Sequence, residues 1–81
     1  MDARTMVAVA GILTTLAETT GSAPASILYI GLGMDHSFYM KVQVILASAG
    51  LIEVSASHLV SITATGRALA EKINAALPAP V

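Results

Sequence analysis

Residues 45–54 of the chain read ILASAGLIEV, and residues 58–70 read HLVSITATGRALA. The first run starts with a helical apolar pattern that stops at Gly50, where a helix can end in a left-handed residue. The segments LIEV and LVSI that follow are typical of short β-strands, and the small polar residues between them are typical of a turn. Thr63 then offers a side-chain cap for another helix. The stretch therefore predicts a helix, a β-hairpin and a further helix, in that order.

The helix that ends at Gly50 is predicted to cover residues 35–49. Asp35 is suited to its N-cap, because a carboxylate accepts backbone N–H bonds and lies at the positive end of the helix dipole. Upstream, Gly31 and Gly33 predict a tight turn in which at least one residue has a positive φ.

Phe38 and Tyr39 are adjacent at the start of this helix, so both cannot point squarely at the core. Tyr39 keeps helical spacing with Val42 and Leu46. We therefore expect Tyr39 in the core and Phe38, partly exposed, at its edge.

The first predicted helix covers residues 5–19. Its main apolar stripe consists of Met6, Val9, Leu13 and Leu16. Other positions around the helix are apolar too, which indicates burial on more than one side. Gly21 is expected to end this helix.

A short second helix is predicted over residues 24–30. Ser22 or Ala23 would be its N-cap, with Pro24 at the first helical position, where the missing N–H costs nothing.

The last predicted helix covers residues 63–77, and Pro78 begins an extended tail over residues 78–81. The 81 residues are expected to form a single domain with its core in residues 5–77. The fold class expected is α+β and mostly helical.

The order of helix, short helix, helix, hairpin and helix resembles the winged helix-turn-helix superfamily of small bacterial and archaeal transcriptional regulators. The residues that match its frame are Leu46, Gly50, Leu51, Ile62, Thr63 and Gly66. The resemblance covers roughly residues 5–77. It implies a sequence-specific DNA-binding module that inserts helix 35–49 in the major groove of double-stranded DNA, while the hairpin, or wing, touches phosphate.

The resemblance also implies which residues would meet DNA. They are the exposed residues early in the recognition helix and those at the wing tip: His36, Ser37, Met40, Lys41, Gln43, Val44, Ser57 and His58. Serine and lysine can bond bases or phosphates, and glutamine can pair with adenine through two hydrogen bonds.

The charge of the chain favours an alternative. The formal net charge is −1, and the recognition helix holds a single basic residue, Lys41. DNA-binding proteins usually carry a basic patch, because neutralising phosphates releases counterions. A winged-helix protein-interaction or dimerisation module without DNA binding is therefore the second hypothesis.

The terminal helices hold more apolar residues than one small core needs, and exposed apolar patches usually mark partner sites. We expect a homodimer built on these helices. The predicted interface residues are Val7, Ala10, Ile12, Ala68, Ala75 and Ala76. A dimer would bring two recognition helices to one duplex.

The same residues argue against an enzyme. The chain has no cysteine, so a disulfide framework and a thiolate metal site are excluded. His36 and His58 lack further ligands at metal spacing. Asp35, His36 and Ser37 are consecutive and point in different directions, which excludes a catalytic relay. We expect no metal and no cofactor, and no pattern indicates an effector pocket.

The apolar stretch 6–17 is shorter than a membrane span. The start of the chain has no net side-chain charge, which disfavours a signal peptide. We therefore expect a cytoplasmic protein without membrane contact. A further alternative is that it forms one domain of a larger regulator or replication protein, with residues 78–81 opening a linker.

Overall fold

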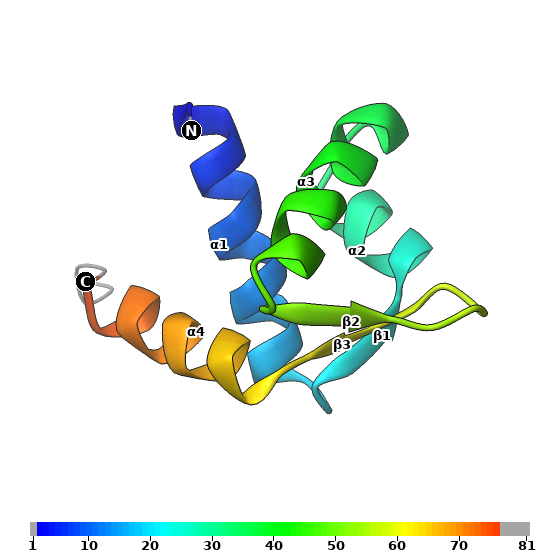
Figure 1. Cartoon of the computed structure of the whole chain (residues 1–81). Helices are drawn as coiled ribbons and strands as arrows, with labels where there is room; N and C mark the ends of the chain where they lie inside the picture. The colour runs from blue at the N-terminus through cyan, green and yellow to red at the C-terminus, as the bar shows by residue number, and fades with distance from the viewer. Residues whose placement is uncertain (1, 77–81) are drawn as a thin grey trace.

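The computed structural model describes residues 2–76, which contain four helices and a three-stranded antiparallel sheet (Figure 1). In chain order the elements are α1 (Ala3–Glu18), β1 (Ser22–Pro24), α2 (Ala25–Gly31), α3 (His36–Ser48), β2 (Ile52–Val54), β3 (Leu59–Ile62) and α4 (Ala64–Ala76). The fold is α+β and is compatible with a winged-helix arrangement. Leu77 and the predicted tail 78–81 lie outside the described residues.

Helix α1 is the central support of the fold. Asp2 caps it, because its Oδ1 accepts a hydrogen bond of 2.8 Å from the Thr5 amide. Figure 1 shows α2 and α3 to one side of α1 and α4 to the other, and α1 packs most extensively against α4. The helix therefore buries more than one face, as its sequence predicted.

The core face of α1 differs in part from the predicted stripe. Met6 was expected in the core, yet 59% of its surface is exposed. Ile12 was expected at a dimer interface, yet it is fully buried. Because α1 is apolar almost all round, periodicity alone does not fix which face turns inward. The buried residues of α1 are Ala8, Ile12, Leu13 and Leu16.

Residues 22–24 form a strand, so the prediction that Ser22 or Ala23 caps the second helix and that Pro24 is its first residue was wrong. Strand β1 pairs antiparallel with β3, and β3 pairs with β2, so the sheet order is β1-β3-β2. The Ser22 and Ser61 hydroxyls are hydrogen-bonded across the pair at 2.9 Å. Pro24 is the last residue of this edge strand, where its lack of an N–H is tolerated, and α2 begins one residue later at Ala25.

The turn between α2 and α3 follows the prediction. Gly33 has φ +67°, and the Met34 amide donates to the Tyr29 carbonyl oxygen at 2.8 Å. Asp35 caps α3 through a 3.3 Å hydrogen bond from the Phe38 amide to its Oδ2. These contacts fix where α3 starts and which side chains occupy its first turn.

The end of α3 and the start of α4 also follow the prediction. Gly50 has φ +75°, in the left-handed region that glycine tolerates. Thr63 precedes α4 and accepts a hydrogen bond of 3.0 Å from the Gly66 amide. The wing, β2 and β3 with their turn, is held between these two points.

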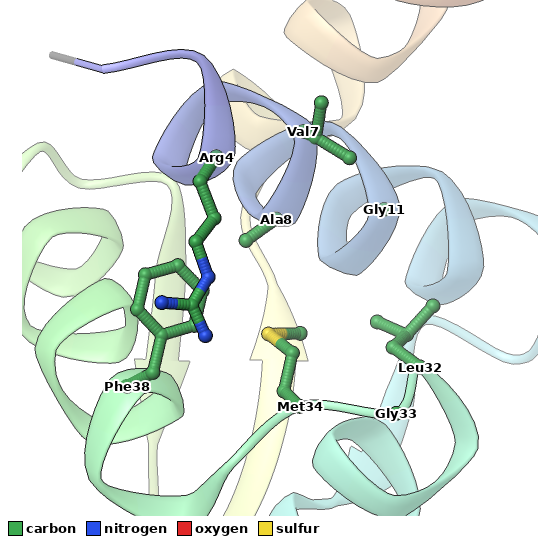
Figure 2. Close-up of a pocket in the computed structure, with 8 residues that line it drawn as sticks. All are labelled: Arg4, Val7, Ala8, Gly11, Leu32, Gly33, Met34 and Phe38. Carbon is green, nitrogen blue, oxygen red and sulfur yellow. The ribbon is translucent and has the colours of Figure 1, made fainter.

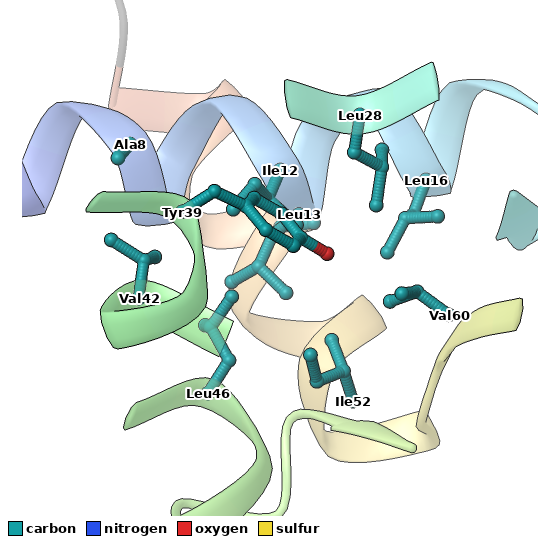
Figure 3. Close-up of a cluster of buried hydrophobic side chains, with 11 residues drawn as sticks. Ala8, Ile12, Leu13, Leu16, Leu28, Tyr39, Val42, Leu46, Ile52 and Val60 are labelled. Carbon is teal, nitrogen blue, oxygen red and sulfur yellow. The ribbon is translucent and has the colours of Figure 1, made fainter. Parts of the chain in front are cut away.

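The core is one cluster at the junction of α1, α3 and the sheet (Figure 3). Tyr39 lies in the middle of it with no exposed surface, and Phe38 is only partly buried, as predicted. The Tyr39 hydroxyl is buried and has no hydrogen-bond partner among the described residues. This desolvation raises the pKa of Tyr39 to about 12.

Candidate functional site

A groove of about 430 Å³ lies where α2, α3 and the wing tip meet. From β1 and α2 it is lined by Pro24, Ala25, Ser26 and Tyr29. From α3 and the wing turn it is lined by His36, Met40, Gln43, Ser57 and His58. We call it the α3–wing groove. Its lining is mostly apolar, while hydroxyl, imidazole and amide side chains supply polar atoms.

The wing tip is held against α2 by the backbone. The His58 carbonyl oxygen accepts a hydrogen bond of 3.0 Å from the Ala25 amide. His58 has φ +62°, an unusual conformation for a residue that is not glycine. Ser55 supports the turn, because its Oγ accepts from the Leu59 amide at 3.2 Å and bonds the Ser57 hydroxyl at 2.9 Å. Ser57 and His58 are therefore placed at the groove by a defined turn.

An aromatic contact orients His36 in the first turn of α3. Its ring lies edge-on to Tyr29, with centroids 5.2 Å apart, and Tyr29 lies 5.5 Å from Tyr39 in the core. Edge-to-face pairs of this kind are favourable because ring edges are positive and ring faces negative. Tyr29 thus links the core to the groove.

Gln43 carries an unused hydrogen-bonding group in the groove wall. Its Oε1 is buried and has no partner among residues 2–76. A buried acceptor without a donor costs about 1–3 kcal/mol. A ligand that donates to this oxygen would recover that energy once the amide turns toward it.

Five of the eight residues predicted to meet DNA line the groove: His36, Met40, Gln43, Ser57 and His58. The other three, Ser37, Lys41 and Val44, are exposed on α3 outside it. The sequence analysis missed the contribution of Pro24, Ala25, Ser26 and Tyr29. No local pattern showed that the start of α2 lies against the wing tip, because that contact joins Ala25 to His58, which is distant in the chain.

The charges near α3 are sparse. Lys41 is its only basic residue, and Asp35 uses its carboxylate to cap the helix. A second cation arrives from α1, since the Arg4 guanidinium lies 4.0 Å from the centroid of the Phe38 ring. No sequence pattern indicated this contact.

Some of the residues predicted for the dimer interface are exposed on the surface, and others are not. Val7 is 73% exposed, and Ala68 and Ala75 are exposed on α4. Ala10 is half-buried, and Ile12, which is buried in the core, is excluded from any such surface. Ala76 ends α4, but its side chain lies outside the described part of the structure.

A second cavity, of about 220 Å³, lies between α1 and the α2–α3 turn (Figure 2). No sequence pattern indicated this cavity. We call it the α1 cavity.

Within residues 2–76, no three His, Asp or Glu side chains gather as a metal site. None of the helices in that range has the length and apolar character to cross a membrane. No protein-family model matches the sequence, and no curated protein matches it.

Proposed function

We propose that the protein is a sequence-specific DNA-binding module of winged-helix type, which acts by binding and not by catalysis. The observation that carries the proposal is the α3–wing groove. The N-terminal half of α3, the start of α2 and the wing tip converge on one side of the molecule, away from α4 (Figure 1). A recognition helix in the major groove, with flanking elements on the phosphates, needs this convergence.

The exposed side chains of α3 have the chemistry for reading bases. Ser37 and Lys41 can donate to bases or phosphates. Val44, which is 60% exposed, and Met40 offer apolar contacts of the kind that recognise the methyl group of thymine. These four residues extend over two turns of α3.

Gln43 would give the module a preference for adenine. A glutamine amide accepts from adenine N6 and donates to N7. The Oε1 of Gln43 has no donor among the residues that the structure describes, so adenine N6 would supply the missing one. This step requires the side chain to rotate from the groove wall toward the duplex.

A homodimer would compensate for the low charge of one copy. Each chain brings only Lys41 on its recognition helix, and two chains bring two helices to one duplex. We infer that the exposed apolar residues of α1 and α4, led by Val7, form the contact. The absence of cysteine is in keeping with a reducing cytoplasm as the place of action.

A protein-interaction module remains the second candidate, and one observation favours it. Ile27 and Ile30 of α2 are 61% and 70% exposed, close in sequence to the groove residues Ser26 and Tyr29. Exposed apolar groups of this size are typical of protein contacts. Salt separates the two candidates, because phosphate contacts weaken steeply with salt and apolar contacts do not.

The experiment is fluorescence anisotropy with a labelled mixed-sequence duplex at low and moderate salt. We expect salt-sensitive binding that Lys41→Ala weakens, with the slope of log K against log salt reduced by about 0.9 for each lost phosphate contact, and hence by about 1.8 for a dimer that loses both copies of Lys41. Lys72→Ala is the matched control, because Lys72 is exposed on α4, away from the groove. Absence of binding at low salt, or equal effects of the two variants, would reject the DNA-binding proposal.

A further inference from the structure

The α1 cavity has an apolar wall and is open because of a missing side chain. Val7 lines its rim from α1 and Leu32 lines it from just after α2. Met34, in the turn before α3, and Phe38, in the first turn of α3, line the opposite side (Figure 2). Gly11 forms the wall between them. A Cβ at Gly11 would lie 3.6 Å from Leu32 Cδ2, in ordinary contact, so any side chain larger than alanine would extend into the space.

One cation stands at this cavity. The guanidinium of Arg4 overlies the Phe38 ring at 4.0 Å from its centroid, and Figure 2 shows the two side by side. The stacking uses the face of the guanidinium. The N–H donors lie in the plane of the guanidinium, along its edge, and the stacking leaves this edge uncovered. Arginine uses the same edge to pair with a carboxylate through two hydrogen bonds.

The nearby carboxylate in the sequence, Asp2, has another role. Its oxygen accepts from the Thr5 amide at the start of α1. Hydrogen bonds from Thr5 are the main reason why the pKa of Asp2 lies below its usual value, and the charge of Arg4 is the smallest contribution. The outward edge of Arg4 is therefore not committed to Asp2.

The volume limits the size of a ligand. An apolar cavity of about 150 Å³ holds benzene. The α1 cavity, at about 220 Å³, has room for an apolar body of about six carbons. An apolar chamber of this size beside one stacked arginine selects a molecule with one negative end.

We propose that the α1 cavity binds a short apolar monocarboxylate, with its hydrocarbon part between Gly11 and Met34 and its carboxylate on the edge of Arg4. Such a ligand would fill space between α1 and the first turn of α3. It would therefore stabilise the packing of α1 on α3. The proposal does not rest on DNA binding, since none of the cavity residues lines the α3–wing groove, although Val7 is shared with the proposed dimer contact.

The test is a titration with hexanoate, followed by amide NMR shifts at constant ionic strength. We expect saturable shifts centred on Gly11, Gly33 and Phe38, and a rise in melting temperature with ligand concentration. The neutral analogue 1-hexanol should bind about tenfold more weakly, because it cannot form the charge-assisted pair.

Two variants separate the two parts of the site. Arg4→Gln should lower hexanoate affinity about tenfold and leave 1-hexanol affinity unchanged, whereas Gly11→Leu should abolish binding of both. Gly11→Ala, whose Cβ meets Leu32 in ordinary contact, keeps the measurement valid if the leucine variant does not fold. It should weaken binding of both compounds. Lys72→Gln is the charge-matched control and should bind as the wild type does.

Three results would overturn the proposal: no shifts up to about 10 mM hexanoate, equal affinity for hexanoate and hexanol, or no effect of Arg4→Gln. None of these measurements includes DNA. Failure here therefore leaves the proposed function to its own test, and the reverse also holds.

Discussion

The hydroxyl of Thr63 donates a hydrogen bond of 2.7 Å to the carbonyl oxygen of Gly50. The Thr63 hydroxyl oxygen in turn accepts a hydrogen bond of 3.0 Å from the Gly66 amide, and the Thr63 amide donates to the Leu51 carbonyl oxygen at 3.1 Å. One residue thus joins the end of α3 to the start of α4 across the base of the wing. The frame Gly50-Leu51 followed by Thr63 and Gly66 is a connected hydrogen-bonded unit.

Thr63→Val removes the hydroxyl and keeps the branched shape. We expect a loss of about 1–2 kcal/mol in the free energy of unfolding, because the variant loses the N-cap of α4 and leaves the Gly50 carbonyl oxygen without this donor. Urea unfolding followed by circular dichroism measures it. Thr65→Ala, at the exposed second position of α4, is the control and should change stability by less than about 0.5 kcal/mol. Equal effects of the two variants would show that the bridge contributes nothing.

Gly66→Ala tests the closeness of α4 to the wing base. A Cβ at Gly66 would overlap the Leu51 carbonyl oxygen and lie 2.9 Å from Ile62 Cγ1. The Leu51 backbone can move away only at a cost in energy, because it is part of the wing base. We therefore expect a loss of about 1–3 kcal/mol in the free energy of unfolding.

The matched control is Gly31→Ala at the end of α2, where a Cβ meets nothing within 4 Å. That variant should be neutral or slightly stabilising, because alanine restricts the unfolded chain. Chemical unfolding of the two variants side by side decides the question. A Gly66→Ala protein as stable as Gly31→Ala would contradict the packing described here.

The features predicted correctly from the sequence are local. Asp35 and Thr63 cap helices through amides three residues away, and Gly50 adopts a positive φ at a helix end. In each case the residues that form the contact are neighbours in the chain. Sequence pattern is sufficient for such features because they need no knowledge of the tertiary fold.

The features that were missed depend on distant partners. Strand β1 exists because Ser22 pairs with Ser61, 39 residues later, and no local pattern of three residues reveals that pairing. The prediction that Ile12 lies at a dimer interface was wrong, because α1 is apolar almost all round and its sequence does not show which face is buried. The groove residue Tyr29 and the α1 cavity follow from how α2 packs. Five of the residues predicted to meet DNA line one groove because the order of the elements brings the start of α3 and the wing tip to the same side, and their contact with DNA stays a prediction.

Tyr39→Phe tests the buried hydroxyl in the core. Because the Tyr39 hydroxyl has no partner among the described residues, removing it takes away a desolvated polar group and no hydrogen bond. We expect the variant to be as stable as the wild type at pH 7, or more stable by up to about 1 kcal/mol. A loss of more than about 1 kcal/mol in the free energy of unfolding would mean that the hydroxyl is hydrogen-bonded in solution.

The same variant should alter stability at alkaline pH. Burial raises the pKa of Tyr39 from 10.0 to about 12 in the folded state. The unfolded chain therefore releases this proton first, and wild-type stability should fall as pH rises from about 10 toward 12. Tyr39→Phe should lack this part of the decline. Urea midpoints of both proteins at pH 8, 10 and 11 would reveal it as a widening difference, and parallel curves would contradict the shift.

Val7→Glu tests the proposed dimer. Val7 is 73% exposed on α1, so a glutamate there leaves the fold intact but places a charge in an apolar contact between copies. We expect the wild type to be a dimer at micromolar concentration and the variant to be a monomer, as measured by size-exclusion chromatography with light scattering. Val44→Glu is the matched control, because Val44 is similarly exposed but lies on α3, and it should remain dimeric. If the wild type is a monomer, the dimer proposal is wrong. The proposed DNA binding would then lack the second copy of Lys41 on which it relies. Dissociation by both variants alike would instead place the contact between copies near α3, where it would compete with a duplex for the same surface.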